Sequence, residues 1–167
     1  EQLVLLGRRL ASVLAYLATE GWVHLDVKPR NIVMTSTPRL IDLSVARPVI
    51  DARGRTGIGT DAYMSPEQAD PERVGEIGPP SDVWGLGATL HEAVTGRQAF
   101  PRQPGEPPYP QLRLPAPALP ERVPAPLATV ILQALAVRPA DRPTAPAIDD
   151  ALEPLADWAS RSARRFR

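Results

Sequence analysis

The stretch HLDVKPRN, residues 24–31, places four reactive side-chain types within eight positions. A further carboxylate, Asp42, follows sixteen positions after Asp26, at the end of a short apolar run. This set suits phosphoryl transfer, in which one carboxylate orients a hydroxyl, an Asn and another carboxylate hold magnesium, and a Lys offsets charge on the moving group. On residue chemistry alone, Asp26, Lys28 and Asn31 also fit a polar turn between strands, and Asp42 fits an ordinary strand-end carboxylate.

The sequence on both sides of this stretch predicts a mainly α fold with one small β-hairpin. Apolar residues at steps of three and four predict a helix over 2–20, which Gly21 ends. Short apolar runs on either side of a Thr-Ser-Thr-Pro turn predict the hairpin, within 22–42. Residues 44–65 lack periodicity and read as a long loop, of the kind that is often functional.

The second half of the chain predicts three more helices. One spans 81–95, with Ser81 or Asp82 as its N-cap, another spans 126–137, and a last one starts near Thr144. Pro154 is expected to kink or end the last helix. Between them, residues 101–126 hold ten Pro in 26 positions and are expected to form an extended surface segment.

Composition excludes several classes of function. The 167 residues have zero formal net charge and form one domain by the usual size prior. Lys28 is the only Lys beside 18 Arg, so a lysine-rich nucleic-acid or membrane patch is excluded, although Arg clusters could still play that part. The absence of Cys excludes thiolate metal sites, and two His are too few for a common zinc site. No apolar run reaches 18 residues, and we expect a cytoplasmic protein with no membrane segment and no nucleic-acid partner.

Five motifs, in order along the chain, resemble those of bacterial Ser/Thr protein kinases. Residues 24–31 match the catalytic loop, in the form with Lys two positions after Asp, and 41–44 resemble the magnesium-binding D-F-G element. Residues 59–68, GTDAYMSPEQ, resemble the end of the activation segment, 42–67. The last two motifs are SDVWGLG at 81–87 and RPADRPT at 138–144. The resemblance implies a kinase-like C-terminal (large) lobe over 1–158, followed by an Arg-rich tail, 159–167.

The resemblance also implies catalytic and metal-binding roles. Asp26 would accept or orient the proton of the substrate hydroxyl, and Lys28 would lie near the transferring phosphoryl group. Thr60 would steady Asp26 and Lys28. Asn31 and Asp42 would hold Mg2+, and Asn31 would thereby help to bind ATP.

Further residues receive structural roles from the same resemblance. Glu67 would pair with Arg142 and brace the lobe, while Asp82 would hydrogen-bond the backbone of the catalytic loop. His24 and Leu43 would stack in the internal spine that ties this loop to the central helix. From the residue alone, His24 is a packed, hydrogen-bonded histidine rather than a catalyst.

The chain departs from the family pattern in four ways, of which Leu43 in place of the Phe of D-F-G is a mild apolar exchange. Leu25 replaces the Arg that commonly pairs with a phosphorylated activation loop, so activation by phosphorylation loses its usual partner. Ser44 replaces the Gly of D-F-G, which affects backbone freedom but leaves Asp42 able to bind metal. No Gly-rich loop or strand Lys precedes the helix at 2–20, so we expect these residues to be the large lobe alone, without the N-terminal (small) lobe. The resemblance also implies that Val33 would form the apolar floor under the adenine of ATP.

These features support two readings of function. In one, the chain is the large lobe of a Ser/Thr kinase that phosphorylates protein Ser or Thr when the missing small lobe completes it; alone it is expected to be inactive. In the other, it is a non-catalytic, kinase-like scaffold that binds a protein through its helical face or the 101–126 segment. A weaker third idea is self-association through the apolar surface that a small lobe would cover.

Overall fold

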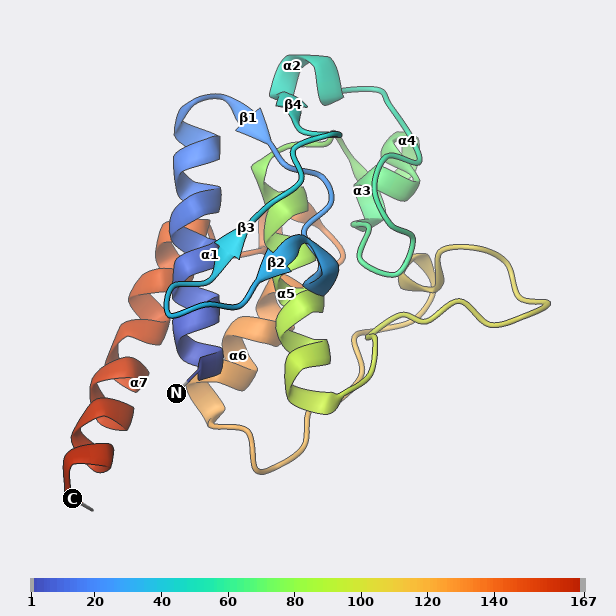
Figure 1. Ribbon diagram of the computed structural model, residues 1–167. Coiled ribbons are helices and arrows are strands. Elements are labelled where there is room, and N and C mark those ends of the chain that lie inside the picture. The colour runs from blue at the N-terminus through green and yellow to red at the C-terminus, as the bar shows by residue number, and fades with distance from the viewer. Residues whose placement is uncertain (1, 166–167) are drawn as a thin grey trace.

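The computed structural model describes residues 2–165, with side chains described as far as residue 156. Four helices form the body, as Figure 1 shows: α1 (Gln2–Thr19), α5 (Pro79–Thr95), α6 (Ala125–Ala134) and α7 (Ala145–Arg165). The predicted mainly α fold with a small β-hairpin is therefore confirmed, and the structure adds a second pair of short antiparallel strands. Within the described part, no helix is long and apolar enough to cross a membrane.

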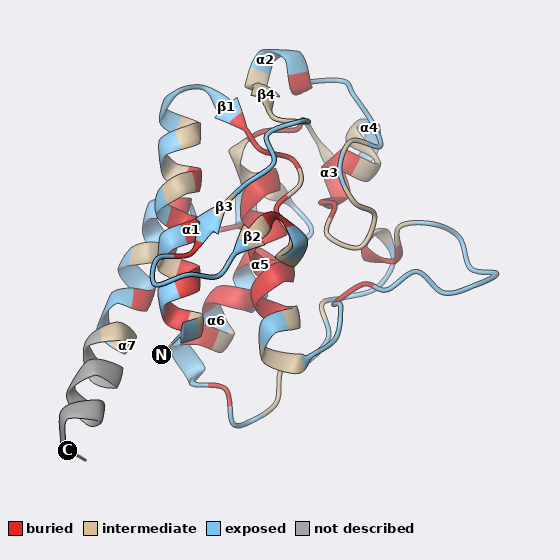
Figure 2. Cartoon of the chain, in the orientation of Figure 1, coloured by how far each residue is buried: buried red, intermediate tan, exposed pale blue. Residues whose placement is uncertain are grey.

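Helix α5 is the centre of the core. Every residue from Ser81 to His91 is buried, and Figure 2 shows this helix red over most of its length. A helix that is buried all round needs small residues where neighbours come close. Gly85 is such a position, because an added Cβ would lie 2.9 Å from the Cβ of Val27 in the catalytic loop. The close approach sets residues 24–31 directly on the core.

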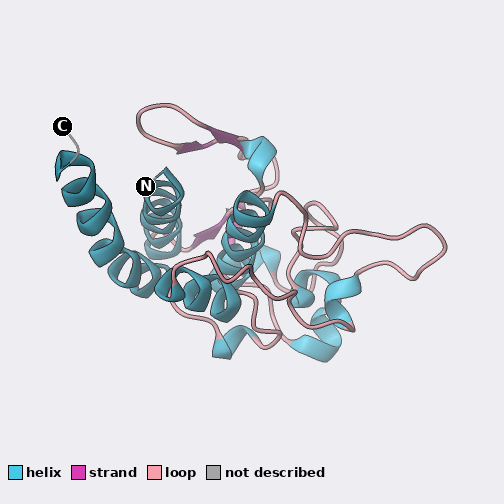
Figure 3. Ribbon diagram, turned by 90° about the horizontal axis from the view of Figure 1, so that it is seen from below, coloured by secondary structure: helices cyan, strands magenta, loops and turns pink. Residues whose placement is uncertain are grey.

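Two pairs of very short strands lie on one side of the helices. Strands β2 (Ile32–Val33) and β3 (Arg39–Leu40) form the antiparallel hairpin that the sequence predicts. Strands β1 (Trp22–Val23) and β4 (Arg47–Pro48) form another antiparallel pair, which joins the end of α1 to the segment after Asp42. Figure 3 shows the two pairs at separate places beside α1.

The expected long loop over 44–65 is not uniformly irregular. It contains β4 and the short helix α2 (Val49–Ala52), in which Ala52 is fully buried. Strand β4 exists because it pairs with β1, a contact between residues 22–23 and 47–48 that local periodicity does not reveal. After Ala52 the chain is irregular as far as α3 (Pro66–Ala69), which is followed by α4 (Pro71–Val74).

The prediction of Ser81 or Asp82 as the N-cap of the central helix is wrong. The helix begins at Pro79, with Gly78 as its N-cap, because proline at the first helical positions loses no intrahelical hydrogen bond. The Ser81 hydroxyl instead accepts a hydrogen bond from the Gly78 N–H at 3.3 Å. Gly96 ends the helix in the left-handed conformation, at φ 73°.

The C-terminal region agrees with the sequence in one respect and differs in another. The Thr144 hydroxyl accepts a hydrogen bond from the Ala147 N–H at 3.3 Å, as expected of the cap of α7. Pro154 does not end the helix, which continues to Arg165. Leu152, just before this proline, is fully buried and packs against Gly7 of α1, which holds the helix in place. Side chains of the 159–167 tail lie outside the described residues.

Most of the Pro-rich segment 101–126 lies on the surface, as expected. Figure 1 shows part of it as a loop that projects from the body of the molecule. Its regular structure comprises the 3-10 turn Pro110–Leu112 and the start of α6. Gln111, in this turn, is fully buried and donates hydrogen bonds to the carbonyls of Asp61 and Met64, at 3.0 and 2.8 Å. The segment is therefore anchored to the end of the activation segment.

Candidate active site

The backbone at the start of the catalytic loop is hydrogen-bonded to the central helix α5. The carboxylate of Asp82 accepts hydrogen bonds from the backbone N–H groups of His24 and Leu25, both at 2.7 Å. Leu25 has a φ of 66°, in the left-handed region that a side chain with a Cβ rarely adopts. Burial raises the pKa of Asp82 to about 6, against the opposing effect of these two hydrogen bonds. Asp82 thus occupies the place that the resemblance assigns to it.

Four predicted site residues meet in one hydrogen-bonded cluster. The Lys28 Nζ donates to Asp26 Oδ2 and to Thr60 Oγ1, both at 2.7 Å. The Thr60 hydroxyl donates to Asp26 Oδ1, also at 2.7 Å. The Asn31 amide donates to Asp26 at the main-chain carbonyl, 2.9 Å, and at Oδ2, 3.0 Å. Both carboxylate oxygens of Asp26 are therefore oriented by neighbours, yet 12% of its side-chain surface stays accessible.

Asp42 lies apart from this cluster, on the exposed segment after the hairpin. The hairpin places it, since the Ile41 N–H donates to the Asn31 carbonyl at 2.9 Å. Asp42 has a φ of 67°, and its Oδ1 accepts from the Ser44 N–H at 3.2 Å. Hydrogen bonds from Ser44 lower the pKa of the Asp42 carboxyl, so it is ionised at neutral pH.

Asn31 and Asp42 fit a magnesium site by their chemistry. Because the Asn31 amide nitrogen is directed at Asp26, its carbonyl oxygen is the atom it can offer to a cation. Asp42 supplies an ionised, exposed carboxylate. Mg2+ takes oxygen ligands and is usually held by one or two carboxylates together with phosphate oxygens and water. Among the described residues, no group of three or more His, Asp or Glu side chains could hold a metal ion by itself. Phosphate oxygens and water would therefore complete the coordination of Mg2+ at Asn31 and Asp42.

His24 is a packed histidine. It is fully buried, and its Nε2 lies 3.2 Å from the carbonyl of Ile41. Burial lowers its pKa, so the ring is neutral and Nε2 can donate to that carbonyl. Leu43 is 63% exposed and Val33 is 42% exposed. The stacking of Leu43 with His24 and the adenine floor at Val33 stay predictions.

The pair of Glu67 and Arg142 is sealed inside the lobe. Two parallel contacts, of 2.6 and 2.7 Å, join the guanidinium to the carboxylate, and both side chains are completely buried. The remaining N–H groups of Arg142 donate to backbone carbonyls of Pro80, Ala136 and Val137. All five donors are thereby used, which is what makes a buried charged pair tolerable.

Sequence reasoning missed several buried or half-buried polar residues near the site. Gln68 bridges the catalytic loop and the activation segment, and Gln111 holds the end of that segment. Tyr63 donates a short hydrogen bond to Glu92 on α5, and burial, aided by Glu92, raises its pKa to about 12. Of these, only Gln68 has a local signal: Ser65-x-x-Gln68 is a capping-box spacing.

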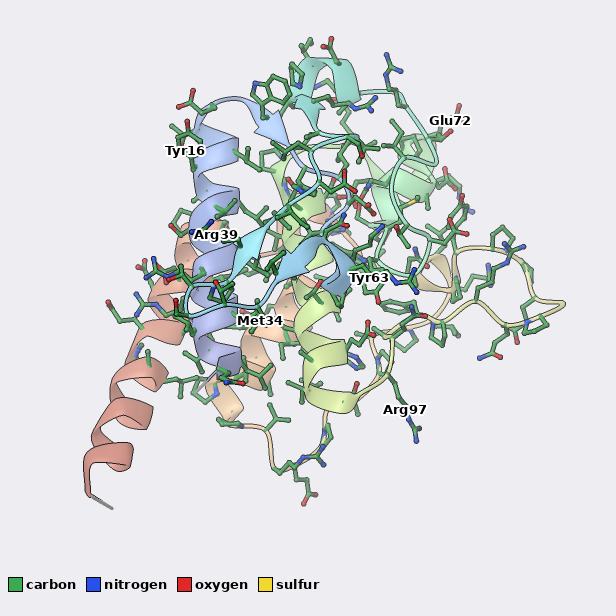
Figure 4. All side chains as sticks on the ribbon, viewed as in Figure 1. Tyr16, Met34, Arg39, Tyr63, Glu72 and Arg97 are labelled. Carbon is green, nitrogen blue, oxygen red and sulfur yellow. The ribbon has the colours of Figure 1, made fainter. Side chains whose placement is uncertain are left out.

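Two apolar side chains are exposed on the hairpin and directly after it. Met34 is 55% exposed at the end of β2, and Ile41 is 42% exposed before Asp42. Figure 4 shows Met34 and Arg39 on the hairpin, with Tyr63 farther along on the side of the activation segment.

Comparison with known proteins shows the family to which the chain is similar. A sequence profile described as the protein kinase domain matches residues 1–152. Serine/threonine-protein kinase PknK of Mycobacterium tuberculosis is 37% identical over 94% of the chain, and PkaA of Streptomyces coelicolor is 37% identical over 84%. The probable serine/threonine-protein kinase PkwA of Thermomonospora curvata is 46% identical over 57% of the chain. The matched regions span only 14%, 27% and 13% of these relatives.

Proposed function

The chain belongs to the protein kinase domain family, within its bacterial Ser/Thr members, and on that premise we propose that it is the large lobe of a Ser/Thr protein kinase. When completed by a small lobe, it would transfer the γ-phosphoryl group of ATP to a Ser or Thr hydroxyl of a protein. The observation that carries the proposal is the closed cluster of Asp26, Lys28, Thr60 and Asn31.

In the proposed reaction Asp26 orients the substrate hydroxyl and accepts its proton. The hydroxyl oxygen forms a bond to the γ-phosphorus as the bond from that phosphorus to the β–γ bridging oxygen breaks. Lys28 offsets negative charge on the moving group, and Thr60 keeps the Asp26 carboxylate in the required orientation. Bound Mg2+, held by Asn31 and Asp42, would neutralise charge on the phosphate oxygens.

The small lobe is an integral part of the proposal. The family's Gly-rich loop and strand Lys are not found in these 167 residues, and the one Lys already contacts Asp26. We expect the isolated chain to bind ATP weakly and to transfer no phosphoryl group. We also propose that it acts in the cytoplasm, where ATP is supplied, and that 1–158 is the functional unit.

The alternative is a non-catalytic scaffold, and Ser44 is the residue that favours it. A side chain at this position restricts a backbone that Gly would leave free, next to a left-handed Asp42. A scaffold, however, has no need of the four-residue cluster around Asp26. The cluster therefore favours catalysis.

The test joins residues 1–167 to a protein kinase small lobe and measures phosphate transfer from labelled ATP to a protein substrate. We expect Mg2+-dependent label on Ser or Thr, and Asp42→Asn should raise the Mg2+ concentration needed for half-maximal rate. No transfer by the completed domain, with the fold intact by circular dichroism, would favour the scaffold. Micromolar ATP binding by the isolated chain in calorimetry would contradict the need for a small lobe.

A further inference from the structure

Gln68 is a neutral, buried side chain whose hydrogen-bonding capacity is directed at two parts of the site at once. Its side-chain nitrogen donates to the carbonyl of Leu25 at 3.0 Å and to the carbonyl of Ile58 at 2.8 Å. Its side-chain oxygen accepts from the Ser65 N–H at 3.0 Å. Only 2% of the residue is exposed, so water does not compete for these bonds.

The contact with Leu25 means that both backbone polar groups of a strained residue are hydrogen-bonded. Asp82 holds the Leu25 N–H from the core side, and Gln68 holds the Leu25 carbonyl from the activation segment. A left-handed φ at a leucine persists only where neighbours fix the backbone on both sides. The next residue is Asp26, so these two hydrogen bonds to the Leu25 backbone determine the position of the Asp26 side chain.

The contact with Ile58 places the activation segment on the catalytic loop. The backbone supports it, because the Gly57 N–H donates to the Gln68 carbonyl at 3.1 Å. Gly59, at φ 117°, lies so close that an added Cβ would be 2.5 Å from the Leu25 carbonyl oxygen. Thr60, the next residue, donates to Asp26. A continuous set of contacts therefore runs from Gln68 through residues 57–60 to the carboxylate.

We propose that Gln68 is a positioning residue, which holds the activation segment and the catalytic loop together at the carbonyls of Ile58 and Leu25. The inference rests on the proposed function for its effect on catalysis. Residue 25 is Leu, so it has no positive charge to pair with a phosphorylated activation segment. The uncharged Gln68 amide aligns the activation segment with the catalytic loop without a phosphate group. The segment is thus set for transfer by the folded sequence itself.

The kinetic test uses Gln68→Glu in the chain joined to a small lobe. Glutamate keeps the oxygen that accepts from Ser65 but loses both donated hydrogen bonds. The cap of α3 is therefore preserved, while the clamp, by which we mean the pair of hydrogen bonds to the Leu25 and Ile58 carbonyls, is removed. We expect kcat to fall about tenfold or more, because two buried carbonyls lose their donor. The KM for ATP should change by less than about twofold, since the nucleotide does not contact Gln68 in the proposed geometry.

Gly59→Ala removes the same alignment by another route, since it leaves Gln68 intact and pushes the segment off the Leu25 carbonyl. It should lower kcat in the same way. The matched control is Thr56→Ala, in the same segment: Thr56 is exposed, and its loss should leave kcat unchanged if no phosphate is needed there. A large loss of kcat in Thr56→Ala would overturn the phosphate-independent part of the proposal.

Hydrogen exchange on the 167-residue chain alone, without a small lobe, tests the clamp independently of any measurement of activity. Gln68→Glu should speed the exchange of the Gly57 amide, which donates to the Gln68 carbonyl, while amides at the centre of α5 keep wild-type protection. Unchanged exchange together with unchanged kcat would overturn the clamp. If the completed wild-type domain transferred no phosphate, the proposed function would fail, and the exchange result would still decide the clamp. If Gln68→Glu did not fold, Gly59→Ala would decide instead.

Discussion

Two charged pairs of nearly equal length have opposite surroundings in this lobe. Lys28 and Asp26 lie 2.7 Å apart and keep 18% and 12% of their side-chain surfaces accessible. Arg142 and Glu67 lie 2.6 Å apart with none accessible. The buried pair has every guanidinium donor satisfied within the protein, whereas the open pair can still reach a substrate. The difference separates a residue set that stabilises the fold from one that is available for chemistry.

Breaking the buried pair should have the largest effect on stability. Arg142→Met leaves the Glu67 carboxylate without its cation in a water-free site, which costs about 3–5 kcal/mol of the free energy of unfolding. Chemical denaturation of the 167-residue chain measures this. The double variant Glu67→Gln/Arg142→Met removes the stranded charge and should recover part of the loss. A single-variant loss below about 1 kcal/mol would show that the pair is not the brace we describe.

Asp82 should produce a smaller effect, visible only as a dependence on pH. Its folded pKa of about 6 lies above the ordinary value of 3.8, so the folded protein holds more protons between these values. Its contribution to stability is complete below about pH 4 and is lost as the pH rises through 6; the total is about 3 kcal/mol.

Denaturation of the wild type and of Asp82→Asn at several pH values isolates this contribution. The difference in unfolding free energy should shift in favour of the wild type as the pH falls from 6 to 4, and should be flat above about pH 7. A difference that does not depend on pH would mean that Asp82 stays ionised in the fold, as its two short hydrogen bonds alone would favour.

An exposed pair beside the brace should have the smallest effect. Arg138 contacts Asp141 through two hydrogen bonds of 3.0 Å, but its side chain is 75% exposed. Arg138→Ala should therefore leave the free energy of unfolding close to the wild-type value, because water screens an exposed ion pair. The same denaturation assay applies. A loss of stability comparable with that of Arg142→Met would show that burial does not explain why the Glu67–Arg142 pair stabilises the fold more than the Arg138–Asp141 pair.

The sequence predicted the parts of this lobe that depend on local pattern. The helix at 2–20, its stop at Gly21 and the stripe at 81–95 follow from apolar spacing and from glycine. The cluster at 24–31 follows from its residue types, and the resemblance linked it to Thr60, 34 positions after Asp26.

What the sequence did not predict depends on partners distant in the chain. Strand β1 at residues 22–23 pairs with β4 at residues 47–48, and no local turn signal joins two segments that lie so far apart in the chain. Gln111 is an ordinary polar residue in a Pro-rich segment until the fold sets it against Met64, and Gln68 matters only because it meets Leu25. The capping-box spacing of Gln68 indicates only its bond to Ser65, because the further role of a buried side-chain amide is set by the carbonyls that it meets in the fold.

The most direct test of the central claim is Asp26→Asn, measured for both chemistry and stability. In the chain joined to a small lobe, phosphoryl transfer should fall by about 10²–10⁴-fold, because the proton acceptor is lost. In the 167-residue chain, the free energy of unfolding should fall by less than in Arg142→Met, because the asparagine keeps an oxygen that can accept hydrogen bonds and the Lys28 partner is not sealed from water. Transfer that persisted at the wild-type rate, or a loss of stability as large as that of Arg142→Met, would contradict the account.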